Sequence, residues 1–95
     1  MVDSAKLNGK KVIGAEAFIL GEVEGIDLNL ETWKVEGLQV GLTNDAATKI
    51  GFKRPIMSQI VIMLPPNLTS SVGDVITLKE AVADLKELVK YLGFR

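Results

Sequence analysis

Two glutamates, Glu22 and Glu24, are the residues of this chain whose type and spacing best suit catalysis, and Asp27 follows close behind them. A pair of carboxylates can act as acid and base when burial raises the pKa of one of them. Here the two flank Val23 in an amphipathic strand pattern, so Val23 should point inward and both glutamates toward water. The pattern therefore favours a solvated, charged strand face, and no catalytic residue is predicted.

Other catalytic groups are scarce. The 95 residues include no histidine and no cysteine, which removes the usual general base at neutral pH, thiolate nucleophiles, disulfides and the commonest metal ligands. Ser58, Ser70 and Ser71 have no histidine to activate them. Ser58 is expected in a strand or turn, and Ser70 and Ser71 in a loop. We therefore expect a protein that is not an enzyme, since turnover would have to rest on Asp, Glu, Lys or Ser alone.

One short motif is similar to the start of a calcium-binding loop. The spacing Asp27-x-Asn29-x-Glu31 places three oxygen ligands at alternate positions. Thr32, however, stands where the loop needs glycine, and Leu38 stands where it needs a bidentate carboxylate. No metal and no cofactor are therefore predicted.

Basic residues gather in two places along the chain. The net charge of −1 gives no bulk attraction to nucleic acid, and no aromatic residues are interleaved with the basic ones. Solvated charge is the simpler interpretation, and an RNA- or ribosome-associated maturation factor is the alternative function. The two groups are Lys6, Lys10 and Lys11, and then Lys49, Lys53 and Arg54, of which the second is the candidate anion contact.

Apolar residues are better candidates for recognition. Trp33 is the single tryptophan and lies in the predicted turn of a hairpin, where it could contact a partner or fold onto the outside of its own hairpin. The run Ile60–Leu64 has no polar face and is flanked by prolines, which predicts a strand covered on both sides. The candidate partner-binding residues are Trp33, Ile60, Ile62, Leu85, Val89 and Leu92.

A long hairpin over residues 21–42 is predicted to position Trp33. Its apolar phase flips between Val23 and Ile26, at Gly25, and again between Val35 and Leu38, across Gly37. A phase flip at a glycine in each of two paired strands indicates bulges or sharp bends. Such bends at matching points would curl a sheet toward a small barrel.

Two helices are predicted. The first is short, with Thr43 or Asn44 as its cap, Asp45 at the positive end of its dipole and Gly51 as its stop. The second runs over residues 78–92, because apolar residues recur there every three or four positions. This stripe consists of Leu78, Val82, Leu85, Val89 and Leu92.

The length predicts one small domain. We expect a flexible N-terminal segment at residues 1–8, a β domain over 9–78, and an amphipathic C-terminal helix over 79–95 that packs on the β domain or on a dimer partner. No apolar run approaches the roughly 20 residues of a membrane helix, and the first residues lack the apolar centre of a signal peptide. A soluble cytoplasmic protein without membrane insertion is expected.

Several stretches resemble the PRC-barrel family. The chain reads G-K-K-V-I from Gly9, L-G-E-V from Leu20, D-L-N-L-E-T-W-K-V-E-G-L-Q-V over residues 27–40, and V-G-D-V-I-T-L over residues 72–78. The family pattern is G-K-x-V, a G-x-V step and a hairpin of the form I-D-x-E-T-G-K-V, and the resemblance spans roughly residues 7–80. Trp33 stands where that pattern usually has glycine. The C-terminal helix is similar to an extension found in some stand-alone archaeal members.

The resemblance implies a small bent β-barrel of about six strands that holds other proteins and has no catalytic residue set. Known members include short archaeal proteins, some of them tied to cell division. We therefore expect a non-enzymatic, archaeal protein–protein interaction adaptor. A homodimer is also expected, because a domain this small can hardly hide both the outer face of Ile60–Leu64 and the helix stripe.

Overall fold

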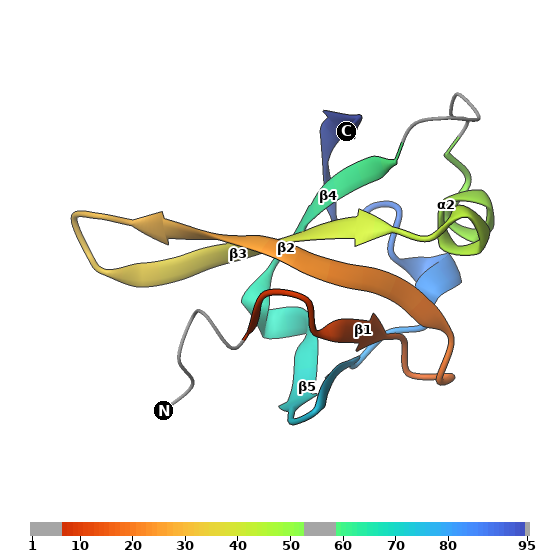
Figure 1. The fold of residues 1–95 in the computed structure, drawn as a ribbon, viewed down its shortest axis with the longest axis horizontal. Helices are drawn as coiled ribbons and strands as arrows, with labels where there is room; N and C mark the ends of the chain where they lie inside the picture. The colour runs from red at the N-terminus through yellow and green to blue at the C-terminus, as the bar shows by residue number, and fades with distance from the viewer. Residues whose placement is uncertain (1–6, 53–58, 95) are drawn as a thin grey trace.

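One mixed β-sheet organises the chain. The computed structural model describes residues 7–52 and 59–94, and within them seven strands form a sheet in the order β5-β6-β1-β2-β3-β4-β7 (Figure 1). Neighbouring strands are antiparallel, except that β1 and β6 are parallel. The expected mainly-β class is confirmed. The strands are β1 (Lys11–Ile13), β2 (Ile19–Asn29), β3 (Lys34–Leu42), β4 (Ile60–Leu64), β5 (Thr69–Val72), β6 (Val75–Leu78) and β7 (Lys90–Phe94).

The long hairpin forms as predicted, from β2 and β3, and it carries two bulges. Val23 pairs with Val40 and Gly25 with Gln39, so Glu24 is an extra residue in β2. Further out, the register shifts again, and this time the extra residue is Glu36 in β3. Each bulge lies next to the glycine at which the sequence changes phase. The two bulges are offset along the hairpin, and each bends the ribbon at a different point.

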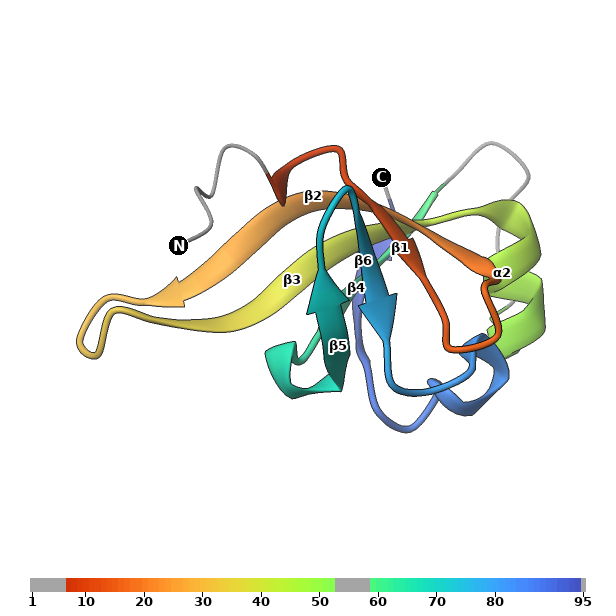
Figure 2. The same ribbon diagram turned by 90° about the horizontal axis from the view of Figure 1, so that it is seen from below.

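The sheet is open, which corrects the expected small bent β-barrel of about six strands. β5 and β7 are the two edges of the sheet and are not paired with each other. The closed shape was expected from bends at matching points, whereas the two bulges are offset along the hairpin, and its outer half extends beyond the sheet (Figure 2). The additional strands β5 and β7 come from segments that were predicted as loop and helix.

The short helix α2 (Asn44–Ile50) follows β3 and ends as predicted. The Thr43 side chain accepts a hydrogen bond from the Ala46 N–H at 3.1 Å, and Gly51 closes the helix with a φ of 108°. Ala46 and Ile50 are buried against the core. The helix is thus capped at both ends, and its buried face packs against one end of the sheet.

We expect Thr43→Ala to lower the free energy of unfolding by about 1 kcal/mol, because the Ala46 N–H loses its side-chain acceptor. Chemical denaturation of the purified chain measures this. Thr43→Ser is the matched control, since it keeps the hydroxyl, and it should restore most of the stability. Equal losses in the two variants would contradict the capping role.

The C-terminal helix predicted over residues 78–92 does not form. β6 runs to Leu78, a 3₁₀ turn η2 (Val82–Asp84) follows, and β7 pairs with β4. Leu78, Val82 and Leu85 are buried, as the predicted stripe required. They lie, however, at the end of β6, in η2 and directly after η2, and not on one helix. A single turn closes where the Val89 N–H donates to the Leu85 carbonyl at 3.1 Å, and the chain then extends as a strand.

The core lies on one side of the sheet. Its fully buried large side chains are Leu20, Ile60, Ile62, Leu64, Ile76, Leu78, Leu85, Val12, Val40 and Val82. On β4 the two faces differ: Ile60, Ile62 and Leu64 point into the core, whereas Val61 and Met63 are half-buried on the other face. A second 3₁₀ turn, η1 (Pro66–Leu68), joins β4 to β5, and Leu68 packs against the core.

The N-terminal segment is described only from Leu7 onward. Of the expected N-terminal segment, residues 1–6 lie outside the described part, while Leu7 packs against the core and the Gly9 N–H donates to the Val23 carbonyl at 2.8 Å. Among the residues that the structure describes, no helix combines the length and the apolar character that crossing a bilayer requires.

Candidate interaction surface

The outer end of the β2–β3 hairpin projects from the sheet. We call residues 28–35 the hairpin tip. Figures 1 and 2 show it extending past β5 and η1 as a two-stranded ribbon, with no described segment packed on either face of its outer part. The molecule is correspondingly elongated, with principal extents of 36 × 25 × 22 Å. A ribbon of two strands is marginal by itself in water, so side-chain chemistry on its two faces decides what it can do.

One face of the ribbon is polar and internally bonded. The Gln39 amide donates to Asp27 at 2.8 Å, and the Asn29 amide donates to Glu36 at 2.8 Å. Lys34 pairs with Asn29 in the register and therefore shares this face. These cross-strand bonds hold the two strands together from one side.

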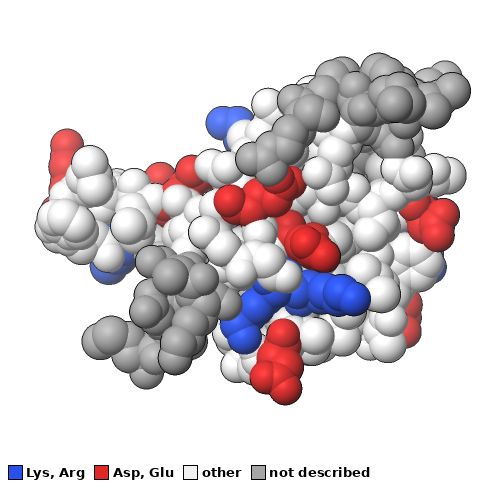
Figure 3. Space-filling view, viewed as in Figure 1, with Lys and Arg blue, Asp and Glu red and all other residues white. Residues whose placement is uncertain are grey.

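The other face of the hairpin tip is apolar and exposed. Leu28 pairs with Val35, and Ile26 pairs with Leu38 on the same side, so this face continues directly from the core. Toward the end of the hairpin the burial is lost. The exposed fractions are Leu28 48%, Val35 43%, Leu30 70% and Trp33 74%. Figure 3 shows a largely white hairpin tip with few charged residues on the face in view.

The turn that carries Trp33 has a left-handed residue. Asn29 pins the turn, because its side-chain oxygen accepts the N–H groups of Glu31 at 2.9 Å and Thr32 at 3.3 Å. The Trp33 N–H donates to the Asn29 carbonyl at 2.6 Å, and Trp33 has a φ of 59°. Glycine adopts this conformation without strain, whereas a bulky residue there is an outlier that costs roughly 1–2 kcal/mol.

The other candidate partner-binding residues lie in different places. Ile60, Ile62 and Leu85 are at most 1% exposed, so they belong to the core of their own chain and form no surface. Val89 is half-buried against the core, and Leu92 on β7 is exposed. The structure therefore does not bring these residues together with Trp33, because the helix stripe that would have aligned some of them is absent.

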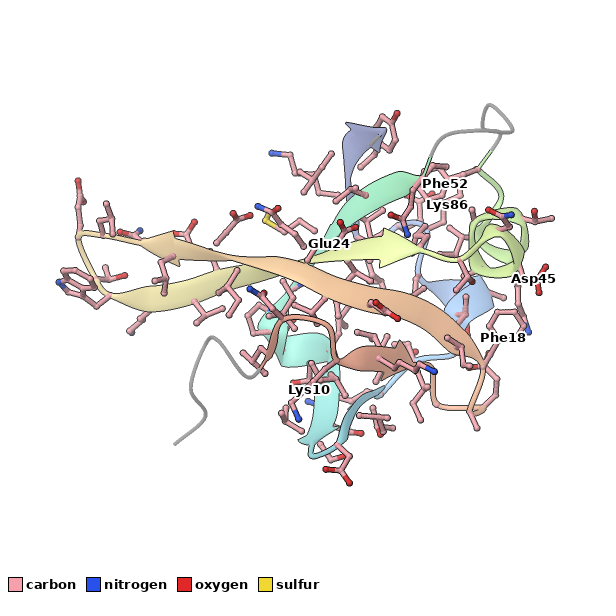
Figure 4. All side chains as sticks on the ribbon, in the orientation of Figure 1. Lys10, Phe18, Glu24, Asp45, Phe52 and Lys86 are labelled. Carbon is pink, nitrogen blue, oxygen red and sulfur yellow. The ribbon has the colours of Figure 1, made fainter. Side chains whose placement is uncertain are left out.

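Glu24 lies on the body of the sheet, away from the hairpin tip (Figure 4), and Glu22 lies two residues before it in β2, where it pairs with Lys11 and Gly41. Glu22 is exposed, as expected, while Glu24 is half-buried at the first bulge. They line an open hollow whose other residues are Gly21, Gly41, Thr43 and Gln59. The Thr43 hydroxyl of this lining accepts the Ala46 N–H at 3.1 Å and donates to the Ile19 carbonyl at 3.4 Å, so it is engaged at the start of α2.

The candidate anion contact is only partly described. Lys53 and Arg54 lie outside the described residues, as does Lys6. The Lys49 ammonium sits 4.2 Å from the Phe18 ring centroid and 3.9 Å from a Glu16 carboxylate oxygen. Lys10 donates to the Gly73 carbonyl. Lys49 and Lys10 are thus engaged within the chain, and Figure 3 shows blue residues lying beside red ones on the visible face.

Three residues of the apolar surface, Leu28, Leu30 and Val35, were not predicted as site residues. The signal for Leu28 and Val35 was present in the sequence, since the phase flips at Gly25 and Gly37 set them on one face with Ile26 and Leu38. The sequence does not show that the outer part of this face lies beyond the core. The structure shows it, because the hairpin tip extends past β5 and η1.

The chain was also compared with known proteins. No protein-family model matches the chain, and no curated protein matches it either.

Proposed function

We propose that this chain is a non-enzymatic protein-interaction module that contacts its partner through the apolar face of the hairpin tip. One observation carries the proposal: Trp33 is 74% exposed and holds a left-handed φ of 59°. A large aromatic ring at this position adds backbone strain and places apolar surface in water. Both costs weaken the isolated chain, so they are best explained by a gain made on binding.

The surroundings of Trp33 support the same role. Leu28, Leu30 and Val35 extend the exposed apolar face, and a cluster of this kind is typical of a contact site. The polar face is bonded internally through Asn29 and Glu36, which keeps the ribbon in shape while the apolar face stays open. Tryptophan is among the residues most enriched at the energetic centres of interfaces.

We further propose that the module is of the PRC-barrel type, an archaeal adaptor with a role such as cell division. The left-handed φ of Trp33 supports this, because the family hairpin has glycine at the corresponding position. In this interpretation the chain keeps the turn geometry of the family while replacing its glycine with a recognition residue.

Trp33→Gly should separate stability from binding. We expect the free energy of unfolding to stay unchanged or rise by up to about 1 kcal/mol, since strain relief offsets the greater freedom of glycine in the unfolded chain. Binding should be lost, because the ring is removed. Denaturant unfolding measures the first effect, and affinity capture from the native cell beside wild type measures the second.

Two controls complete this experiment. Trp33→Ala removes the ring but keeps the strain, so it should lose binding without gaining stability. Glu31→Gln alters the charge of the same turn and should bind as wild type does. A drop of more than about 1 kcal/mol in Trp33→Gly would mean that the ring stabilises its own hairpin, and an unchanged set of captured proteins would remove Trp33 from the contact site.

A further inference from the structure

We propose that the occupant of the apolar face is a second copy of this chain, with two hairpin tips packed face to face about a two-fold axis. The inference rests on the proposed function and names its partner. In such an isologous contact Leu28 and Val35 of one copy meet the same surface of the other. Trp33 of each copy then reaches the inner end of its partner's tip, where Ile26 is half-buried.

Charge favours this partner. Leu28 and Val35 face the same side, while Lys34 and Glu36 belong to the opposite, bonded face. Two identical copies can therefore approach through this face without setting like charges against each other. The net charge of −1 gives little repulsion between whole molecules. A partner chosen by charge would instead need a charged residue on the apolar face of the strands.

The layering of the hairpin tip favours a second copy, and its area sets the strength of the contact. The four exposed side chains offer on the order of 400 Å² of apolar surface. A specific interface usually needs about 800 Å² from each partner. The two tips alone supply about half of that area, with one Trp33 from each copy, so the two-fold contact is expected to be weak and reversible. A second ribbon stacked at roughly 10 Å also gives the tip the second layer that a lone ribbon lacks. We expect a dimer in the micromolar range.

Tryptophan fluorescence tests this directly, because Trp33 is the only tryptophan. On raising the concentration of the full chain from nanomolar to hundreds of micromolar, the emission should shift to shorter wavelength as the indole is buried. Sedimentation should show the dimer over the same range. Leu28→Ser keeps the reporter and should weaken association by roughly tenfold or more, whereas Lys34→Ser, on the opposite face, should associate as wild type does. An emission maximum that does not move with concentration would overturn the proposal.

Cross-linking tests which face is used. The chain has no cysteine of its own, so a single introduced thiol reports one position. Under mild oxidation Val35→Cys should form disulfide-linked dimers at least about tenfold faster than Lys34→Cys, its exposed neighbour on the other face. Equal rates, or a faster reaction of Lys34→Cys, would overturn the face-to-face arrangement. Circular dichroism of both variants verifies that the fold is kept.

The outcomes also separate this inference from the proposed function. If capture from the cell depends on Trp33 while the purified chain shows no concentration-dependent shift, the partner is a different protein. That result overturns the dimer and leaves the interaction surface in place. If the chain dimerises and Trp33→Gly dimerises equally well, the dimer uses another surface, and the face-to-face inference is wrong.

Discussion

Leu85→Ala is expected to lower the free energy of unfolding by about 2–5 kcal/mol, while Leu88→Ala lowers it by less than about 1 kcal/mol. Leu85 is fully buried where η2 ends, and its loss leaves a cavity beneath the sheet. Leu88 is 41% exposed and fills no such space. Denaturant unfolding of the two variants beside wild type measures the difference.

The same pair distinguishes the observed turn from a helix. On an amphipathic helix over residues 78–92, Leu88 widens the apolar stripe beside Leu85, and both would be costly to truncate. In the structure only Leu85 enters the core. Comparable losses for the two variants would contradict the arrangement of η2 and β7 described above.

Gly21→Ala is expected to lower the free energy of unfolding by roughly 3 kcal/mol or more, because the new methyl group has no room. A Cβ at this position would collide with the backbone carbonyl of Gly41 on the neighbouring strand, and it would lie 3.1 Å from the Leu42 Cα. Backbone cannot rotate away as a side chain can, so β2 and β3 would have to separate. Thermal or denaturant unfolding measures the loss.

Gly25→Ala is the matched control in the same strand. Its nearest neighbours are side-chain atoms of Gln39, from 3.2 Å outward, and these can move. We expect a loss below about 1 kcal/mol. If Gly25→Ala destabilises the protein as much as Gly21→Ala, the close approach of the strands at Gly21 is not what makes that glycine necessary.

Local signals explain the parts of the fold that were predicted correctly. Thr43 and Gly51 mark the ends of α2 because their own side chain or conformation satisfies the helix termini. Gly25 and Gly37 mark the bulges because a change of apolar phase needs an extra residue in the strand. In each case the cause lies within a few residues of the effect.

The C-terminal helix was predicted wrongly because its competitor is distant in sequence. Spacings of three and four at Leu78, Val82 and Leu85 indicate a common buried side, and the structure does bury them. An isolated helix of this length is marginal, whereas β7 pairs with β4 from Ile60↔Phe94 to Met63↔Lys90, with one register shift. The local sequence of residues 78–92 does not show that β4 has an open edge with which this segment can pair.

The candidate site was predicted in part. Trp33 stood out because a lone tryptophan in a turn has few structural uses, but its left-handed conformation follows from the pinning of the turn by Asn29. Ile60 and Ile62, which were named as candidate partner contacts, are buried in the core, and an unbroken apolar run does not say which of its residues face the core. In the structure, one face of β4 is buried in the core and the other is only half-buried.

The place of β1 between β2 and β6 has a consequence for synthesis of the chain. Val12 pairs with Gly21, which the ribosome makes soon afterwards, but its parallel partner is Ile76. A nascent chain therefore carries β1 with one open edge until almost the whole sequence has emerged. During that interval the strand can template wrong pairings, so crowding of neighbouring ribosomes, and any chaperone that shields this edge, should influence the yield of folded protein.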